Sequence, residues 1–201
     1  VMATLIQLCA LSIALALAGC VTSAPAPGAG PFAVVDGIRV PFTQAGTGSE
    51  AVIFVHGWAG DRSFWQAQLA DPALGRGRRL IAMDLPGHGQ SDAPKTAYTM
   101  DLFVRSIAAV MDKAGVDRAV LVGHSNGTPM VREFYRKYPE RTAGLVVVDG
   151  ALRSYFTNST QWIEFIAPLR TKDYKKNAAR LVDSWVKPIG DGALKERISK
   201  A

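Results

Sequence analysis

The strongest chemical signal in the sequence is a serine that stands between two glycines. Residues 123–127 read Gly-His-Ser-Asn-Gly, which fits the pattern G-x-S-x-G. An apolar run of strand length precedes the pattern and a helical pattern follows it, so the serine is expected at a sharp strand-to-helix turn. Any side chain at Gly123 or Gly127 would crowd such a turn. The pattern therefore predicts that Ser125 is a nucleophile held in a strained turn.

The sequence offers no clear base for this serine. A serine hydroxyl is a weak nucleophile until a positioned base, most often histidine, takes its proton. The three histidines, His56, His88 and His124, all precede Ser125. His56 is expected to brace its own turn through hydrogen bonds, and His88 lies in a glycine-rich turn. Because His124 adjoins the serine at the turn, its ring should point away from the serine's pocket. We therefore expect none of the three to be the general base.

Short apolar runs alternate with helical patterns along the middle of the chain. A hairpin is predicted for residues 32–46, around the turn dipeptide Asp36-Gly37. Further strands are predicted at residues 51–55, 79–84, 118–123 and 144–150. Helices are predicted at residues 99–115, with Thr99 as N-cap, and at residues 126–140. The alternation predicts an α/β fold, with a mainly parallel sheet covered by helices on both faces.

From about residue 154 the pattern is helical only. The helical segments are residues 160–169, 178–186 and 192–199. No strand is predicted after the run at residues 144–150. The sheet is therefore expected to be incomplete, with an apolar strand at its open edge.

Three motifs make the chain resemble the α/β-hydrolase fold superfamily. They are VHGWAG after the third strand, DLPGHGQSD after the fourth, and GHSNG, in the order that the family uses. The resemblance implies an esterase-like serine hydrolase that acts on small carboxylic esters or related acyl substrates and needs no cofactor or metal. It implies that Ser125 attacks the carbonyl carbon while the backbone N–H groups of Trp58 and Asn126 hold the oxyanion. Gly57 would keep the loop that carries Trp58 uncrowded.

The resemblance covers about residues 32–201, but the family's order of serine, acid and histidine is incomplete there. Asp149, at the end of the last predicted strand, is the candidate acid, and a structural carboxylate at a strand end is the competing interpretation. We expect an incomplete hydrolase core at residues 32–150, the start of a helical cap at residues 151–201, and a catalytic histidine in a missing C-terminal segment. The alternative is a non-catalytic, lipid-anchored binding protein that retains the hydrolase scaffold.

A mostly apolar stretch forms residues 2–20, and a Pro-, Ala- and Gly-rich tether follows it. Leu17-Ala18-Gly19-Cys20 resembles the lipobox of bacterial lipoproteins, whose cysteine is lipidated. We expect a signal peptide at residues 1–20, a linker at residues 21–31, and export to the cell envelope with a membrane anchor on Cys20. Cleavage after Ala18, giving a secreted or periplasmic protein, and an uncleaved anchor stay open, because no Lys or Arg precedes the apolar stretch.

The composition is that of a globular protein and argues against several kinds of partner. Of 201 residues, 48% are hydrophobic and 20% are charged, and the net charge is +6. Residues 170–201 hold nine Lys or Arg against four Asp or Glu, but these alternate with apolar residues as on the solvated face of a helix. The sequence contains no nucleic-acid-binding motif, Walker A loop or zinc spacing, so we expect no nucleic acid or metal as partner. Both cysteines lie in the N-terminal stretch, so no disulfide is expected in the mature domain.

Overall fold

The computed structural model describes residues 30–150, 159–186 and 192. The expected signal peptide, nearly all of the tether and the lipidation site Cys20 lie outside the described residues, as does nearly all of the helix predicted at residues 192–199. The strands and helices predicted within residues 32–150, and the helical segments predicted at residues 160–169 and 178–186, lie within the described ranges.

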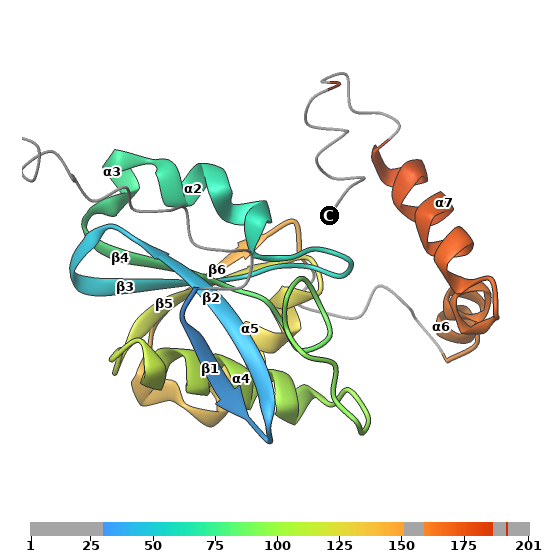
Figure 1. Cartoon of the computed structure of the whole chain (residues 1–201), viewed down its shortest axis with the longest axis horizontal. Helices are drawn as coiled ribbons and strands as arrows, with labels where there is room; N and C mark the ends of the chain where they lie inside the picture. Colours follow the sequence, from blue (N-terminus) through green and yellow to red (C-terminus); the bar gives the residue numbers. More distant parts are fainter. Residues whose placement is uncertain (1–29, 151–158, 187–191, 193–201) are drawn as a thin grey trace, which may run out of the picture. The chain divides into compact units, whose positions relative to one another are not determined.

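Six strands form one sheet, in the order β1-β2-β4-β3-β5-β6 (Figure 1). They are β1 (Phe32–Val35), β2 (Ile38–Ala45), β3 (Thr47–Val55), β4 (Arg76–Met83), β5 (Ala119–His124) and β6 (Thr142–Val148). β1 and β2 form the predicted hairpin, β2 also runs antiparallel to β4, and every other neighbouring pair is parallel. The prediction of a mainly parallel sheet is confirmed.

Helices cover both faces of the sheet (Figure 1). One face carries α4 (Met100–Lys113) and α5 (Gly127–Lys137), and the 3-10 helix η2 (Pro139–Arg141) follows α5. The other face carries the 3-10 helix η1 (Arg62–Trp65) and the short helices α2 (Gln66–Ala70) and α3 (Pro72–Gly75). α4 begins where its cap was predicted, since the Thr99 hydroxyl accepts a hydrogen bond from the backbone N–H of Leu102.

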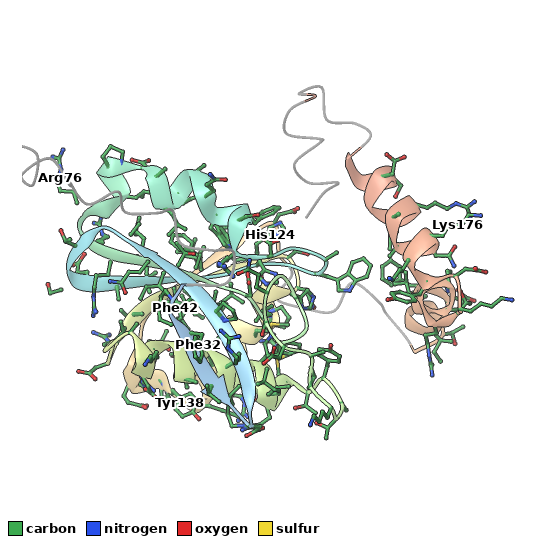
Figure 2. All side chains as sticks on the ribbon, in the orientation of Figure 1. Phe32, Phe42, Arg76, His124, Tyr138 and Lys176 are labelled. Carbon is green, nitrogen blue, oxygen red and sulfur yellow. The ribbon has the colours of Figure 1, made fainter. Side chains whose placement is uncertain are left out.

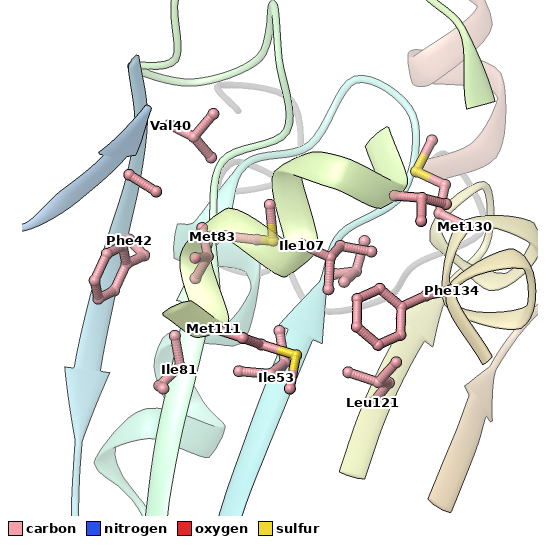
Figure 3. Close-up of a cluster of buried hydrophobic side chains, with 14 of the residues drawn as sticks. Val40, Phe42, Ile53, Ile81, Met83, Ile107, Met111, Leu121, Met130 and Phe134 are labelled. Atoms are coloured by element: carbon pink, nitrogen blue, oxygen red, sulfur yellow. The ribbon is translucent and has the colours of Figure 1, made fainter. Parts of the chain in front are cut away.

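Apolar side chains fill the space between the sheet and the helices on each face. Ile53 and Leu121 of the central strands pack in one large cluster with Phe134 of α5 (Figure 3). On the opposite face, Phe54 packs against Trp65, with ring centroids 4.9 Å apart. Because both faces are covered, β3 is apolar over its last five positions and β5 over its first four, which is why they read as continuous runs in the sequence.

A separate helical segment is described beyond residue 158. It comprises α6 (Ser159–Ile166), the 3-10 helix η3 (Ala167–Arg170) and α7 (Tyr174–Val186), which correspond to two of the predicted helical patterns. The Asn177 amide donates to the backbone oxygen of Pro168 at 2.7 Å and so ties α7 to the end of η3. The basic residues of this segment are exposed, including Lys176 on α7 (Figure 2). This is the solvated charged face that the sequence predicted.

Candidate active site

The carboxyl ends of β3, β4, β5 and β6 lie along one edge of the sheet, because these strands are parallel. Of the non-glycine residues that the structure describes, four have positive φ, and three of them follow these strand ends: Ala59, Ser125 and Asp149. A left-handed backbone at such residues persists only where its surroundings hold it, and it often marks a functional site. Open parallel sheets also bind their ligands outside this edge. The candidate site therefore lies here, at the end of the sheet where His124 is found (Figure 2).

Ser125 stands at the turn from β5 into α5 with φ of 47°. A Cβ at Gly123 would lie 2.8 Å from the backbone oxygen of Gly127, and a Cβ at Gly127 would lie 2.6 Å from the backbone oxygen of Val55. Backbone atoms cannot move aside as flexible side chains do, so both positions require glycine. The two glycines thus make room for a turn that places Ser125 at the site edge, where it is half-buried.

Backbone hydrogen bonds hold this turn. The Ser125 N–H donates to the backbone oxygen of Val148 in β6 at 3.0 Å, and the Ser125 oxygen accepts from the N–H of Thr128 at 3.0 Å. The Thr128 hydroxyl donates to the Gly123 oxygen at 3.1 Å. The Ser125 backbone is therefore held by two strands and by the first turn of α5.

The loop of residues 57–61, after β3, lies directly against the turn. A Cβ at Gly57 would come within 2.9 Å of the Ser125 Cβ and 2.8 Å of the His124 Nδ1. Gly57 is therefore required for the close approach of the two segments. This contact brings the loop that carries Trp58 beside Ser125, while Asn126 is exposed at the start of α5. The backbone groups of Trp58 and Asn126 thus come from the two segments that meet at the serine.

His56 is completely buried, and both of its ring nitrogens are engaged. Nδ1 lies 2.8 Å from the Gly57 oxygen and donates to it, while Nε2 accepts from the N–H of Leu85 at 3.0 Å. Burial lowers the pKa of His56 to about 4. The ring is therefore neutral at pH 7 and joins the loop after β3 to the segment after β4.

The other two histidines also have neighbours of their own. The His88 Nδ1 lies 3.1 Å from the backbone oxygen of Pro86, and the His88 ring lies 5.3 Å from that of His56. The His124 ring stacks on Phe64 at 4.6 Å, and its buried Nδ1 has no hydrogen-bond partner within the described part of the chain. Burial lowers the pKa of His124. These contacts show what each ring packs against, and no contact between a histidine nitrogen and Ser125 Oγ is among them.

Asp149 follows β6 directly and has φ of 44°. Its side chain is exposed, and its charge lies close enough to His124 to oppose the effect of burial on the pKa of that ring. The next residue, Gly150, packs so tightly on α5 that a Cβ there would lie 1.8 Å from the Thr128 hydroxyl. The structure therefore brings Asp149 to the same edge as Ser125, whose N–H donates to the oxygen of the preceding residue, Val148.

The site also contains a buried ion pair that sequence reasoning missed. Asp84, 1% exposed, follows β4 and pairs with the guanidinium of Arg62 from the segment after β3. Burial raises the pKa of the Asp84 carboxyl, while its hydrogen bonds from Arg62 and Gln90 act in the opposite direction. Asp84 opens the DLPGHGQSD motif and could have been singled out, but nothing local identifies its partner among the basic residues.

The described residues contain no group of three or more His, Cys, Asp or Glu side chains arranged to hold a metal ion. Within the same ranges, no helix is both long enough and apolar enough to cross a membrane.

Known proteins match this chain over most of its length. The family described as alpha/beta hydrolase fold matches residues 50–188. A 2-hydroxy-6-oxononadienedioate/2-hydroxy-6-oxononatrienedioate hydrolase of Burkholderia vietnamiensis is 32% identical over 155 residues, which cover 74% of this chain and 54% of that protein. The dihydrolipoyllysine-residue acetyltransferase component of the acetoin cleaving system of Cupriavidus necator is 38% identical over 117 residues, 58% of this chain and 31% of that protein.

Among solved structures, a thermophilic esterase from Thermogutta terrifontis is similar with a TM-score of 0.69 and 26% identity. The similarity covers 85% of this chain and 65% of the esterase. The chain spans about half or less of the length of the two curated relatives.

Proposed function

Because the chain belongs to the α/β-hydrolase fold family, we propose that it is a serine hydrolase of carboxylic esters or related small acyl compounds, with Ser125 as nucleophile. The observation that carries the proposal is the backbone of Ser125, whose φ is 47° between two glycines that admit no Cβ. A serine with a purely structural role gains nothing from such strain. The names of the Thermogutta esterase and the Burkholderia hydrolase support a small-molecule substrate.

The proposed reaction follows from the groups that meet at this edge. Ser125 Oγ attacks the carbonyl carbon while a base takes the hydroxyl proton, and the carbonyl oxygen becomes an oxyanion. The backbone N–H groups of Trp58 and Asn126 donate to this oxyanion, each contributing about 3–4 kcal/mol to transition-state stabilisation. The ester C–O bond then breaks, the base returns its proton to the departing alcohol, and water hydrolyses the acyl-enzyme to release the acid.

We place the general base outside these 201 residues, because each histidine is unsuited to the role. Both nitrogens of His56 are engaged, and its pKa of about 4 leaves it a weak base. His88 is bonded within its own turn, and His124 stacks on Phe64 instead of contacting the nucleophile. Asp149 is our candidate for the acid that orients the base, since it follows β6 at the same edge.

Two further parts of the proposal concern the ends of the chain. Residues 151–201, which include α6 and α7, would begin a cap that closes over the site and excludes water. Cys20 would carry the lipid that holds the exported protein on the membrane. Replacement by serine, Cys20→Ser, should move the protein from the membrane fraction to the soluble fraction, whereas retention in the membrane would indicate an uncleaved anchor.

The nucleophile is tested with a fluorophosphonate probe on the full-length product of the gene and on the 201-residue chain. We expect rapid labelling of Ser125 in the full-length product, located by mass spectrometry, and slow labelling of residues 1–201 alone if the base lies outside them. Ser125→Ala should lower hydrolysis of short p-nitrophenyl esters by about 1,000-fold or more, whereas the matched variant of an exposed serine, Ser49→Ala, should leave it unchanged. A folded full-length product that stays unlabelled would overturn the proposal and favour a binding protein.

A further inference from the structure

The two ends of loop 57–61 are held by two consecutive residues of another segment. At the first end, His56 donates to the Gly57 oxygen and accepts from the N–H of Leu85. At the second end, the N–H of Arg62 donates to Asp84 Oδ1 at 2.8 Å. Asp84 and Leu85 directly follow β4. The dipeptide therefore fixes the distance between the ends of a loop whose middle, at Ala59, has a left-handed backbone with φ of 57°.

The buried Asp84 carboxylate accepts hydrogen bonds from two different segments of the chain. Besides the Arg62 N–H, its Oδ2 accepts from the Arg62 guanidinium and from the N–H of Gln90 at 2.9 Å. Gly89, with φ of 54°, lies so close that a Cβ there would come within 2.6 Å of the Asp84 Oδ2. Residues 89 and 90 thus fold back against the Asp84 carboxylate. Its remaining contacts are with Arg62, which comes from the segment after β3.

All three guanidinium nitrogens of Arg62 donate hydrogen bonds at this position. In addition to the carboxylate, Nη2 donates to Gln90 Oε1 at 2.7 Å, and Nε donates to the Thr43 hydroxyl of β2 at 3.1 Å. A planar guanidinium held at three points has little freedom to rotate. The start of η1, directly after loop 57–61, is therefore attached to β2 through Thr43 and to the segment after β4 through Asp84 and Gln90.

We propose that Arg62 and Asp84 are positioning residues that set the place of the Trp58 N–H group relative to Ser125. This inference rests on the proposed function, because Trp58 is an oxyanion donor only in a hydrolase. The loop has to keep the Trp58 N–H in position to donate to an oxyanion that forms only in the transition state. If the far end of the loop is released, the donor moves while Ser125, held by β5, β6 and α5, stays in place.

The test measures the loop and the reaction separately in the full-length product. In Arg62→Gln, amide hydrogen exchange should rise about tenfold or more in residues 57–61 and stay unchanged in α4. The kcat for ester hydrolysis should fall about 10- to 100-fold with KM changed less than about threefold, because a donor acting in the transition state is displaced. Arg62→Lys, which can reach Asp84 but not all three acceptors, should recover part of the kcat.

Two sets of variants keep the test decisive. Thr43→Val and Gln90→Ala each remove one acceptor of the Arg62 guanidinium and leave its pair with Asp84 intact. If Arg62→Gln does not fold, the same two measurements are made on these variants, with smaller changes expected in the same direction. Arg105→Gln, which breaks exposed ion pairs with Asp36 and Asp101, is the matched control and should change neither measurement. Unchanged exchange in residues 57–61 of a folded Arg62→Gln protein would overturn the inference, even if the wild type hydrolyses no ester. Faster exchange with unchanged kcat would overturn the catalytic part of it.

Discussion

The two segments that meet at Ser125 are held in different ways. The turn from β5 to α5 contains glycines that exclude any side chain, and backbone hydrogen bonds to Val148 and Thr128 complete it. Loop 57–61 is instead held by side chains, the imidazole of His56 and the ion pair of Arg62 with Asp84. The first construction depends on shape and the second on charge and protonation.

The two segments should therefore respond differently to substitutions and to changes of pH. The turn from β5 to α5 should be disrupted when a side chain replaces one of its glycines, and it should be insensitive to pH. A construction from imidazole and carboxylate contacts fails when protons are added, and it tolerates changes of side-chain volume at its exposed contacts. Four predictions, in order of decreasing expected effect on the free energy of unfolding, test this contrast.

The largest effect is expected from Gly127→Ala in the turn. Its Cβ would lie 2.6 Å from the Val55 oxygen and 2.8 Å from the His56 oxygen, both of them backbone atoms. The free energy of unfolding should fall by more than about 3 kcal/mol, measured by urea denaturation at pH 7.5. The matched control is Gly144→Ala in β6, where a Cβ would meet one side-chain atom at 3.9 Å, and it should be close to neutral. Similar losses in both would contradict the steric account.

The next effect is a pH dependence that comes from His56. Its pKa is about 4 in the folded protein and about 6.5 when unfolded, so the unfolded state binds the proton first. The stability contributed is fully present above pH 6.5 and decreases as the pH falls, by about 3 kcal/mol at pH 4. Urea denaturation between pH 7.5 and 4 measures it. His56→Gln should be less stable at pH 7.5 but should lose less on acidification, and equal losses in the two proteins would exclude His56 as the cause.

A smaller effect is expected from Thr128→Val, which removes the side-chain hydrogen bond of the turn. The buried hydroxyl donates to the Gly123 oxygen at 3.1 Å, and valine leaves that oxygen with one partner fewer. The free energy of unfolding should fall by about 1–2 kcal/mol. Thr47→Val, at an exposed position of β3, is the control and should change it by less than about 0.5 kcal/mol. Equal changes in the free energy of unfolding for the two variants would mean that the Thr128 hydroxyl does not stabilise the turn.

The smallest effect is expected from Gln90→Ala at the edge of the charged network. Its side chain accepts an exposed hydrogen bond from Arg62, while its backbone bond to Asp84 stays. Stability should fall by less than about 1 kcal/mol, yet amide exchange in residues 57–61 should still rise. A loss of several kcal/mol would mean that the loop depends on this contact more than on the buried ion pair.

Much of the fold was predictable because its signals are local. The turn dipeptide Asp36-Gly37, the cap at Thr99 and the apolar runs of β3 to β6 each specify an element within a few residues. The helices η1, α2 and α3 were missed because each is only four or five residues long, too short for helical periodicity to show. β3 also begins earlier than predicted, at Thr47, where Thr47 and Glu50 pair with Arg76 and Arg78 of β4 across an irregular stretch instead of continuing the apolar run.

The candidate site divides in the same way. Ser125 with its glycines, and Gly57 beside them, could be identified from short motifs because the steric requirement lies within the motif. The pairing of Arg62 with Asp84 joins residues that are far apart in the sequence, and nothing local distinguishes Arg62 from the other arginines. The buried Nδ1 of His124 could not be anticipated either, since its surroundings come from η1 and from residue 57.

The bond from the Ser125 N–H to the Val148 oxygen also has a consequence for synthesis of the chain on the ribosome. Val148 is made 23 residues after Ser125, so the turn cannot close on β6 until then. At about 5–20 residues per second, this delay is roughly 1 to 5 s. The same delay separates the emergence of Ser125 and Val148 from the ribosome, and during it β5 can pair with β3 while Ser125 samples relaxed backbone conformations. Ser125 therefore reaches its left-handed backbone geometry only after β6 has become available to accept its N–H.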